Sequence, residues 1–290
     1  MQVDSYADID AMNGSTIIHG AHSMLRLKRA IDGELQKTTQ AMGVGSMVHC
    51  LVLEPEKFEQ RYCTMPAFET DAENKTDKGK PSTSKATTYY KQAKEKFLAK
   101  EDREVVSSYD MSLAQRVAAN IKRKPSGKRW VSGVAEEAFT GTIAGVPYKG
   151  RIDCYGPDWI CDVKTCAELG RKFFYGSHGM RELLYIERLA GYRELFRQRF
   201  GKIPEVRIVA AETTGDLDVA VYWVPSIVLD GGYSNLCQLL TRYKQCKESG
   251  EWPGIDGGAD EMLLDQGIIN KYLPGDDDLQ FEPPAEEEPA

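Results

Sequence analysis

The sequence predicts an α/β protein in which a central mixed β-sheet is flanked by helices and preceded by a helical part. Three observations support this class. Apolar residues recur at helical spacing before residue 130, and short runs rich in Val, Ile, Tyr and Phe begin after Trp130. Helical and strand-like patterns then alternate up to about residue 247. With 290 residues, the chain is long enough to bury a full core.

We expect one compact domain with three parts. Residues 1–130 form the helical part, residues 131–255 form the core with the sheet, and residues 256–290 form an acidic tail. From Pro274 onward the tail has the composition of a disordered segment.

The net charge of −7 arises at the C-terminal end. Seven of the 44 acidic residues lie after residue 275, which leaves 37 acidic residues against the 37 basic ones before it. A neutral body can still carry a basic groove for nucleic acid. The acidic tail could mimic DNA or attract a basic partner, although solubility alone would account for it. One cluster of bases could line a groove or be a solvated face: Lys122, Arg123, Lys124, Lys128 and Arg129.

The first twenty residues contain no apolar run long enough for a signal peptide or a membrane span, so we expect a cytoplasmic protein. The seven cysteines are an odd number and include no C-x2-C pair. This spacing argues against a zinc or iron–sulfur site. We therefore expect reduced thiols, most of them in the core.

The helical part contains one unusually apolar helix. The run from Gly43 to Phe58 begins with small residues and is closed by Pro55, before which a helix must end. This helix would present His49 to the interior. Residues 69–87 have almost no apolar content and many lysines, which predicts a loop. Two further helices are predicted, over residues 88–100 and 110–122.

Residues 149–165 predict a β-hairpin, because two runs with strand-like alternation flank a Gly-Pro-Asp turn. If the four residues after Tyr155 connect the strands, Tyr155 pairs with Ile160. Stepping outward by two residues on each strand then places Asp153 opposite Asp162, with both side chains on one face.

Lys164 lies two residues beyond Asp162 and therefore emerges on the same face as the two acids. Opposed carboxylates lie about 5 Å apart and repel unless a cation lies between them. Carboxylates that hold Mg²⁺, beside a lysine that orients a water, suit phosphodiester hydrolysis. An ordinary surface hairpin is the alternative, because D-x-K is common by chance. Asp158, in the literal Pro-Asp of the turn, cannot reach the same sheet face.

The rest of the core continues the alternation. A helix is predicted from about residue 180 to residue 200, and a second from 236 to 247. Between them, two strands are predicted over residues 206–211 and 219–224.

The hairpin motifs, Gly-Arg-Ile-Asp ending at Asp153 and Asp-Val-Lys-Thr beginning at Asp162, resemble the PD-(D/E)XK nucleases. Residues 39–58 resemble the upstream block of phage and prophage exonucleases of the RecE (exonuclease eight) type. That block joins a small-residue helix start, a histidine and a Leu-Glu-Pro-x-x-Phe ending. The loop through residues 78–80 and the segment Gly-Glu-Trp-Pro at residues 250–253 are similar to family features as well.

The resemblance covers roughly residues 15–255 and implies a restriction-endonuclease-like core with a metal site. It implies that His49 is a metal ligand together with Asp153, Asp162 and the backbone carbonyl of Val163. Without the resemblance, a lone histidine in an apolar helix is usually a packing residue. Neutral imidazole is nevertheless a sound partner for a hard cation.

Further site residues follow from the same resemblance. An acidic residue on the strand before the hairpin often assists, and Glu136 is better aligned for this than Glu137. A helix after the core motif carries glutamine and tyrosine four residues apart in the family, and here Arg188 and Tyr192 occupy those places. Both could bind a DNA phosphate, since residues four apart share a helix face. An exposed arginine is the alternative. Arg151 of the Gly-Arg-Ile-Asp motif is a further DNA-binding candidate.

The implied activity is an Mg²⁺-dependent exonuclease, with Mn²⁺ as a substitute, that degrades linear double-stranded DNA in the 5′ to 3′ direction. The resemblance also implies a ring-shaped homo-oligomer of three or four subunits and a RecT-like annealing protein as partner in phage recombination, inside a bacterial host. Two alternatives remain open. One is a structure-specific or nicking endonuclease of the same superfamily, and the other is a catalytically silent DNA-binding subunit.

Overall fold

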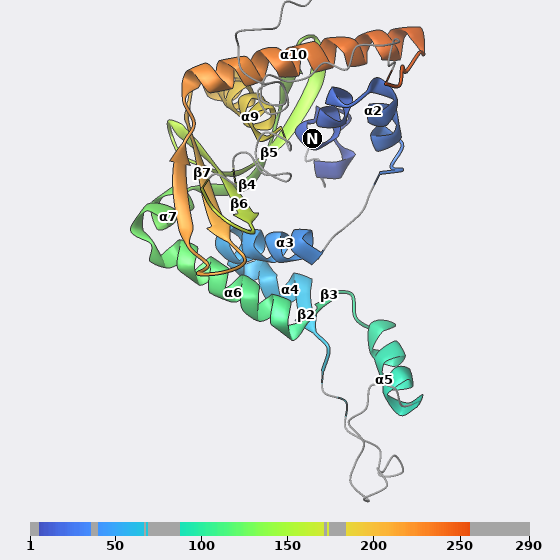
Figure 1. Ribbon diagram of the computed structural model, residues 1–290, viewed down its shortest axis with the longest axis vertical. Coiled ribbons are helices and arrows are strands. Elements are labelled where there is room, and N and C mark those ends of the chain that lie inside the picture. The colour runs from blue at the N-terminus through green and yellow to red at the C-terminus, as the bar shows by residue number, and fades with distance from the viewer. Residues whose placement is uncertain are drawn as a thin grey trace, which may run out of the picture. The chain divides into compact units, whose positions relative to one another are not determined.

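The computed structural model describes residues 6–35, 40–66, 68, 88–170, 173 and 184–255. Within these residues the predicted class is confirmed, because a central mixed sheet carries helices on both faces (Figure 1). No helix of the described part is long and apolar enough to cross a membrane. The lysine-rich segment 69–87 and the tail 256–290 lie outside the described residues, so the loop, the tail and the division into parts stay predictions.

In the part of the chain that the structure describes, the central sheet has six strands. They are β1 (Met12–Asn13), β4 (Val134–Ile143), β5 (Val146–Tyr155), β6 (Trp159–Cys166), β7 (Glu205–Glu212) and β8 (Val219–Trp223). β5 has three neighbours: antiparallel β4 follows its whole length, whereas parallel β1 and antiparallel β6 each pair with only two of its residues. β7 pairs with β6 in parallel, and β8 pairs with β7 antiparallel.

Helices cover both faces of this sheet (Figure 1). α9 (Tyr185–Phe200) and α10 (Ser226–Ser249) pack on one face, and α3 (Gln40–Leu53) and α6 (Ser108–Arg123) pack on the other. Each face has its own hydrophobic cluster, one around Tyr148 and Ile152 and the other around Met47 and Val163. The remaining helical segments are η1 (Tyr6–Asp8), α1 (Gly14–Ile17), η2 (Ile18–Ala21), α2 (Met24–Ile31), η3 (Pro55–Lys57), α4 (Phe58–Arg61), α5 (Thr88–Leu98) and α7 (Pro125–Trp130).

The N-terminal part contributes strands as well as helices. β1 adds to the central sheet, and β2 (Tyr62–Thr64) pairs in parallel with β3 (Glu104–Val106) in a separate two-stranded sheet. The sequence pattern did not predict these strands. Each has only two or three residues, which is too short for an alternating pattern to stand out.

The predicted helices are present, with some ends displaced. α3 ends at Leu53, before Pro55, as predicted, and α5 and α6 agree with prediction to within two residues. α10 begins at Ser226, well before the predicted start at Leu236. Two glycines weaken the helical pattern in that first part. A Cβ on Gly232 would lie only 2.6 Å from Cγ2 of Ile186 in α9, so glycine lets the two helices pack closely.

Candidate active site

The hairpin of β5 and β6 has the predicted register. Tyr155 pairs with Ile160, and the next pair is Cys154 with Cys161. The ladder ends there, so the predicted pairing of Asp153 with Asp162 is not part of it, and further along the same edge of β5 pairs with β1. We call the divergence beyond Cys154 and Cys161 the β5–β6 fork. At the fork, the side chain of Asp153 accepts a hydrogen bond from the backbone amide of Val163 at 2.7 Å.

Asp162 and Lys164 stand on the β6 side of the fork. The Lys164 ammonium forms an ion pair with Oδ2 of Asp162 and donates a hydrogen bond to the carbonyl of Val163 at 3.2 Å. Asp162 is only 4% exposed, so its Oδ2 meets the Lys164 ammonium largely out of contact with solvent. Burial raises the pKa of Asp162 above its usual value, Lys164 opposes this rise, and Asp153 adds to it. The three predicted catalytic side chains therefore influence one another closely.

His49 reaches the fork from α3. The helix packs tightly on β6, since a Cβ on Gly45 would lie 3.0 Å from Oγ1 of Thr165. Nε2 of His49 lies 2.7 Å from the carbonyl oxygen of Val163, and Nδ1 lies 3.6 Å from Oδ2 of Asp153. The structure thus brings His49 to two of the three partners that the family resemblance implies.

Glu136, rather than Glu137, joins this group. Oε1 of Glu136 lies 3.9 Å from Nδ1 of His49, and Oε2 is 2.8 Å from Nε of Arg151. Glu137 instead accepts a hydrogen bond from the Tyr155 hydroxyl and pairs with Arg199. Glu136 has a φ of 53°, in the left-handed region that side chains other than glycine rarely adopt. Backbone strain of this kind is often found at functional sites.

The described residues fit a divalent cation. One ligand atom each from His49, Glu136 and Asp153 lie within 4.8 Å of one another. Asp162 is not in this compact group, although it was predicted as a ligand, because its carboxylate is turned to Lys164. Imidazole and carboxylate groups are ligands that divalent cations accept.

The charge balance at His49 reflects these neighbours. Burial alone would lower the pKa of His49, but the carboxylates of Asp153 and Glu136 outweigh it and raise the pKa above its ordinary value. For Lys164, burial also acts to lower the pKa, and Asp162 and Asp153 again outweigh it, so the pKa is raised. The carboxylates therefore favour positive charge on both His49 and Lys164.

Arg188 and Tyr192 lie on the inner side of α9. Tyr192 is 8% exposed and packs on β5, where a Cβ on Gly150 would lie 2.7 Å from its ring. Arg188 is partly buried rather than exposed, and its Nε has no hydrogen-bond partner in the described part of the chain. Burial would lower the pKa of Arg188, but Tyr192 and Asp162 outweigh it and raise the pKa. The described residues therefore leave one buried guanidinium N–H of Arg188 without an acceptor.

Tyr185 is a neighbour of the site that the sequence pattern did not predict. Its ring centroid lies 5.4 Å from Nζ of Lys164 and 5.8 Å from Cζ of Arg188. Tyr185 precedes Arg188 by three residues in α9, and this spacing, which puts both on one helix face, was the available signal.

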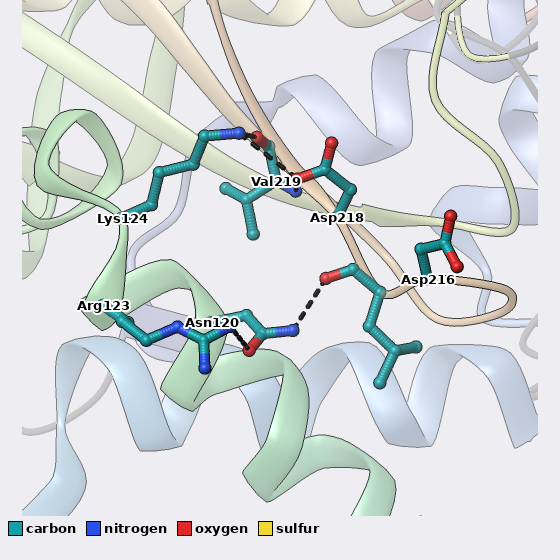
Figure 2. Close-up of a pocket in the computed structure, with 7 residues that line it drawn as sticks. Asn120, Arg123, Lys124, Asp216, Asp218 and Val219 are labelled. Atoms are coloured by element: carbon teal, nitrogen blue, oxygen red, sulfur yellow. Dashed lines mark hydrogen bonds and ion pairs between the residues drawn. The ribbon is translucent and has the colours of Figure 1, made fainter.

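A pocket of about 400 Å³ lies away from this group, where α6 meets the turn between β7 and β8. Figure 2 shows Lys124 reaching Asp218 and Val219 across it, and Asn120 extending toward the same turn. Lys122 donates to the carbonyl of Leu51 at 2.7 Å. Two lysines of the basic cluster thus fasten α6 to its neighbours, and none of the predicted site residues lines this pocket.

A family model matches residues 19–263, and its description is a PDDEXK-like domain of unknown function (DUF3799). The chain belongs to this PDDEXK-like family. The match contains every residue that was predicted for the site, from His49 to Tyr192. The order of Asp153, Asp162 and Lys164 agrees with the acid, acid, lysine pattern in the family's name.

The PDDEXK-like fold also appears among solved structures. The crystal structure of a "Putative exonuclease" from Eubacterium rectale has a TM-score of 0.62 to this chain. The two are 16% identical, and the similarity covers 94% of this chain and 98% of the other. At this identity the likeness shows the PDDEXK-like fold alone. No curated protein matches the chain in sequence. The family match and the shared fold together support a nuclease.

Proposed function

We propose that this protein is a divalent-metal-dependent exonuclease that degrades linear double-stranded DNA. The observation that carries the proposal is the meeting of Asp153, Asp162 and Lys164 at the β5–β6 fork, with His49 beside them. Two carboxylates and a lysine near one another suit metal-assisted phosphodiester hydrolysis. The description of the Eubacterium rectale protein as an exonuclease supports action on chain ends. The resemblance of residues 39–58 to the RecE type supports DNA as the substrate.

The side chains have distinct tasks in this proposal. His49, Glu136, Asp153 and Asp162 would hold the cation, with the Val163 carbonyl beside them, and a bound Mg²⁺ or Mn²⁺ would polarise the phosphate and acidify a water. Lys164 stays protonated, since its pKa is raised, and its ammonium orients the attacking water or steadies negative charge at the phosphate.

Arg188 holds the substrate beside the reacting phosphate. Its Nε–H lacks a partner among the described residues, and a guanidinium binds phosphate oxygens with charge-assisted hydrogen bonds. Tyr192, packed against Gly150, fixes the orientation of Arg188 by lying next to it on the same helix face. Arg151 is an exposed cation paired with Glu136, and its exposed side chain would bind a DNA phosphate beside the site.

The finer proposals concern direction and partners. We propose 5′ to 3′ degradation in phage or prophage recombination, a ring-shaped homo-oligomer of three or four subunits, and a RecT-like annealing protein as partner. A ring around the duplex would keep the enzyme on its substrate between cleavage steps. These proposals rest on the RecE-type motifs.

The experiment compares two forms of one DNA with Mg²⁺ present. An exonuclease degrades the linear duplex and leaves the covalently closed circle intact. Cutting of the circle at a similar rate would favour the endonuclease alternative. Binding of the linear duplex with no degradation, in Mg²⁺ or Mn²⁺, would favour the catalytically silent subunit. End-labelling each strand separately at its 5′ end gives the direction.

A further inference from the structure

Lys149 is a buried lysine of β5 whose ammonium group is occupied by the N-terminal segment. Only 6% of Lys149 is exposed. Its Nζ donates hydrogen bonds to the backbone carbonyls of Tyr6 at 2.9 Å, Ala7 at 3.3 Å and Ile9 at 2.7 Å. An ammonium group has three N–H donors, so three carbonyls satisfy it fully. Because a buried charge without partners is costly, this contact fixes residues 6–9 against β5.

The sheet fixes the same segment a second time. β1 follows directly and pairs with β5, with Met12 opposite Tyr148 and Asn13 opposite Lys149. This pairing uses the edge of β5 that β6 leaves at the fork. We call residues 6–13 the N-terminal strap. The strap lies outside the residues that the family model matches, which begin at residue 19.

Tyr6 is the strap residue that lies among the cations of the site. Nζ of Lys149 is 4.8 Å from the centroid of its ring, and Cζ of Arg151 is 5.5 Å from it. Arg151 is in turn 2.8 Å from the carboxylate of Glu136. A chain of direct contacts therefore runs from the strap to the candidate metal ligands.

The electrostatics of Tyr6 agree with this position. Burial and the neighbouring Tyr192 raise the pKa of Tyr6 to about 12, while Arg151 and Arg188 act to lower it. The phenol therefore keeps its proton at neutral pH and can donate a hydrogen bond. Nε of Arg188, on the α9 side of the same group, is a buried donor without a partner among the described residues. The Tyr6 hydroxyl, the Arg188 Nε–H and the Arg151 guanidinium are all donors, and such donors suit an anionic oxygen.

We propose that the N-terminal strap forms part of the substrate-binding wall. The Tyr6 hydroxyl donates a hydrogen bond to a DNA phosphate next to the one that Arg188 binds. Lys149 is a positioning residue that acts through Tyr6. The proposal rests on the proposed function, because it takes DNA as the substrate.

The test measures the affinity of the full-length protein for a short fluorescein-labelled DNA duplex in EDTA, together with KM and kcat for degradation of a linear duplex in Mg²⁺. Tyr6→Phe removes only the hydroxyl, and it should raise Kd and KM about tenfold, as expected for one hydrogen bond to a charged group, with kcat unchanged. Tyr109→Phe is the matched control, because Tyr109 is 72% exposed on α6. It should bind and cut as the wild type does.

Lys149→Met should raise the Kd for DNA as Tyr6→Phe does. The double variant should bind DNA no more weakly than either single variant, because both changes remove the same hydrogen bond from Tyr6 to the phosphate. A double variant whose losses add would overturn the positioning role. If Lys149→Met does not fold, Tyr6→Phe and Tyr6→Ala still decide, since wild-type affinity in both would overturn the proposal. In that case, degradation by the wild type but not by Asp162→Asn would leave the proposed function intact. A wild type that neither binds nor degrades duplex DNA would instead remove the proposed function.

Discussion

Asp153 and Val163 are joined by a hydrogen bond of 2.7 Å, in which the Val163 amide donates to the Asp153 carboxylate. A backbone partner would occupy this amide in an uninterrupted antiparallel ladder. Here the ladder has ended, and the Asp153 side chain accepts the hydrogen bond in place of a backbone carbonyl. His49 lies close to the same two residues, with Nε2 at 2.7 Å from the Val163 carbonyl oxygen and Nδ1 at 3.6 Å from Oδ2 of Asp153. The divergence of β5 and β6 thus leaves the Val163 amide free to position the Asp153 carboxylate.

His49→Ala should weaken metal binding. His49 contributes a nitrogen to the compact group with Glu136 and Asp153, and losing a group that supports a metal site costs about tenfold to a hundredfold in affinity. Calorimetric titration with Mn²⁺ and Mg²⁺ measures this. His22→Ala is the control, because His22 is exposed and distant in sequence from the fork elements. Unchanged affinity in His49→Ala would return His49 to a packing role.

Glu136→Gly should make the protein more stable and less active. Relief of a left-handed φ on a non-glycine residue is worth about 1 kcal/mol, and removing the carboxylate ends its repulsion with Asp153. Glu136→Gln is the control, because it removes the charge and keeps the strain. Urea unfolding should rank Glu136→Gly above Glu136→Gln, and metal affinity should fall in both. Equal stability of the two variants would show that the backbone there stores no strain.

The fold and the hairpin register were predictable from the sequence because their causes are local. The Gly-Pro-Asp turn and the alternating runs on both sides fix which residues face each other, and the observed pair of Tyr155 with Ile160 follows. The contact of His49 with Val163 spans 114 residues, and only the family resemblance pointed to it.

Three other features could not be predicted from the sequence: the burial of Lys149, the left-handed backbone of Glu136 and the strand β1. Nothing in the sequence marks Lys149 as buried, since its three acceptors are carbonyls more than a hundred residues earlier. The left-handed backbone of Glu136 is imposed by packing, because a glutamate does not favour it. β1 is too short to give a pattern of its own.

Gly150→Ala should disturb the substrate side of the site. The added Cβ would lie 2.7 Å from the Tyr192 ring, and overpacking of this kind costs about 1–3 kcal/mol. Urea unfolding should show the loss, and affinity for duplex DNA should fall because Tyr192 and Arg188 must shift. Gly43→Ala is the control, since its Cβ would meet nothing within 4 Å in α3. A fully stable Gly150→Ala with normal DNA affinity would contradict the tight packing.

Protonation of Glu137 should lower the free energy of unfolding at acidic pH. Burial would raise its pKa, but the hydrogen bonds from Tyr155 and Arg199 outweigh it and lower the pKa below the ordinary value. As the pH falls, the Glu137 carboxylate therefore takes up a proton at a higher pH in the unfolded chain than in the folded protein. Its contribution to the free energy of unfolding is fully present above the unfolded pKa, and it is lost as the pH falls through the folded pKa. Urea unfolding measured from pH 7 downward should show that the free energy of unfolding declines less in Glu137→Gln than in the wild type. The difference between the two declines should be less than about 1 kcal/mol, because the pair of Glu137 with Arg199 is partly exposed. Identical pH dependence would contradict the assignment.

The most direct test of the catalytic assignment compares the two aspartates that could belong to the motif. Asp162 lies at the fork, whereas Asp158, which follows Pro157, is exposed in the hairpin turn. Degradation of an end-labelled linear duplex in Mg²⁺ is measured for the wild type, Asp162→Asn, Lys164→Ala and Asp158→Asn. Asp162→Asn and Lys164→Ala should lose about a hundredfold or more in rate, and Asp158→Asn should match the wild type. Equal degradation by all four proteins would contradict the site at the fork.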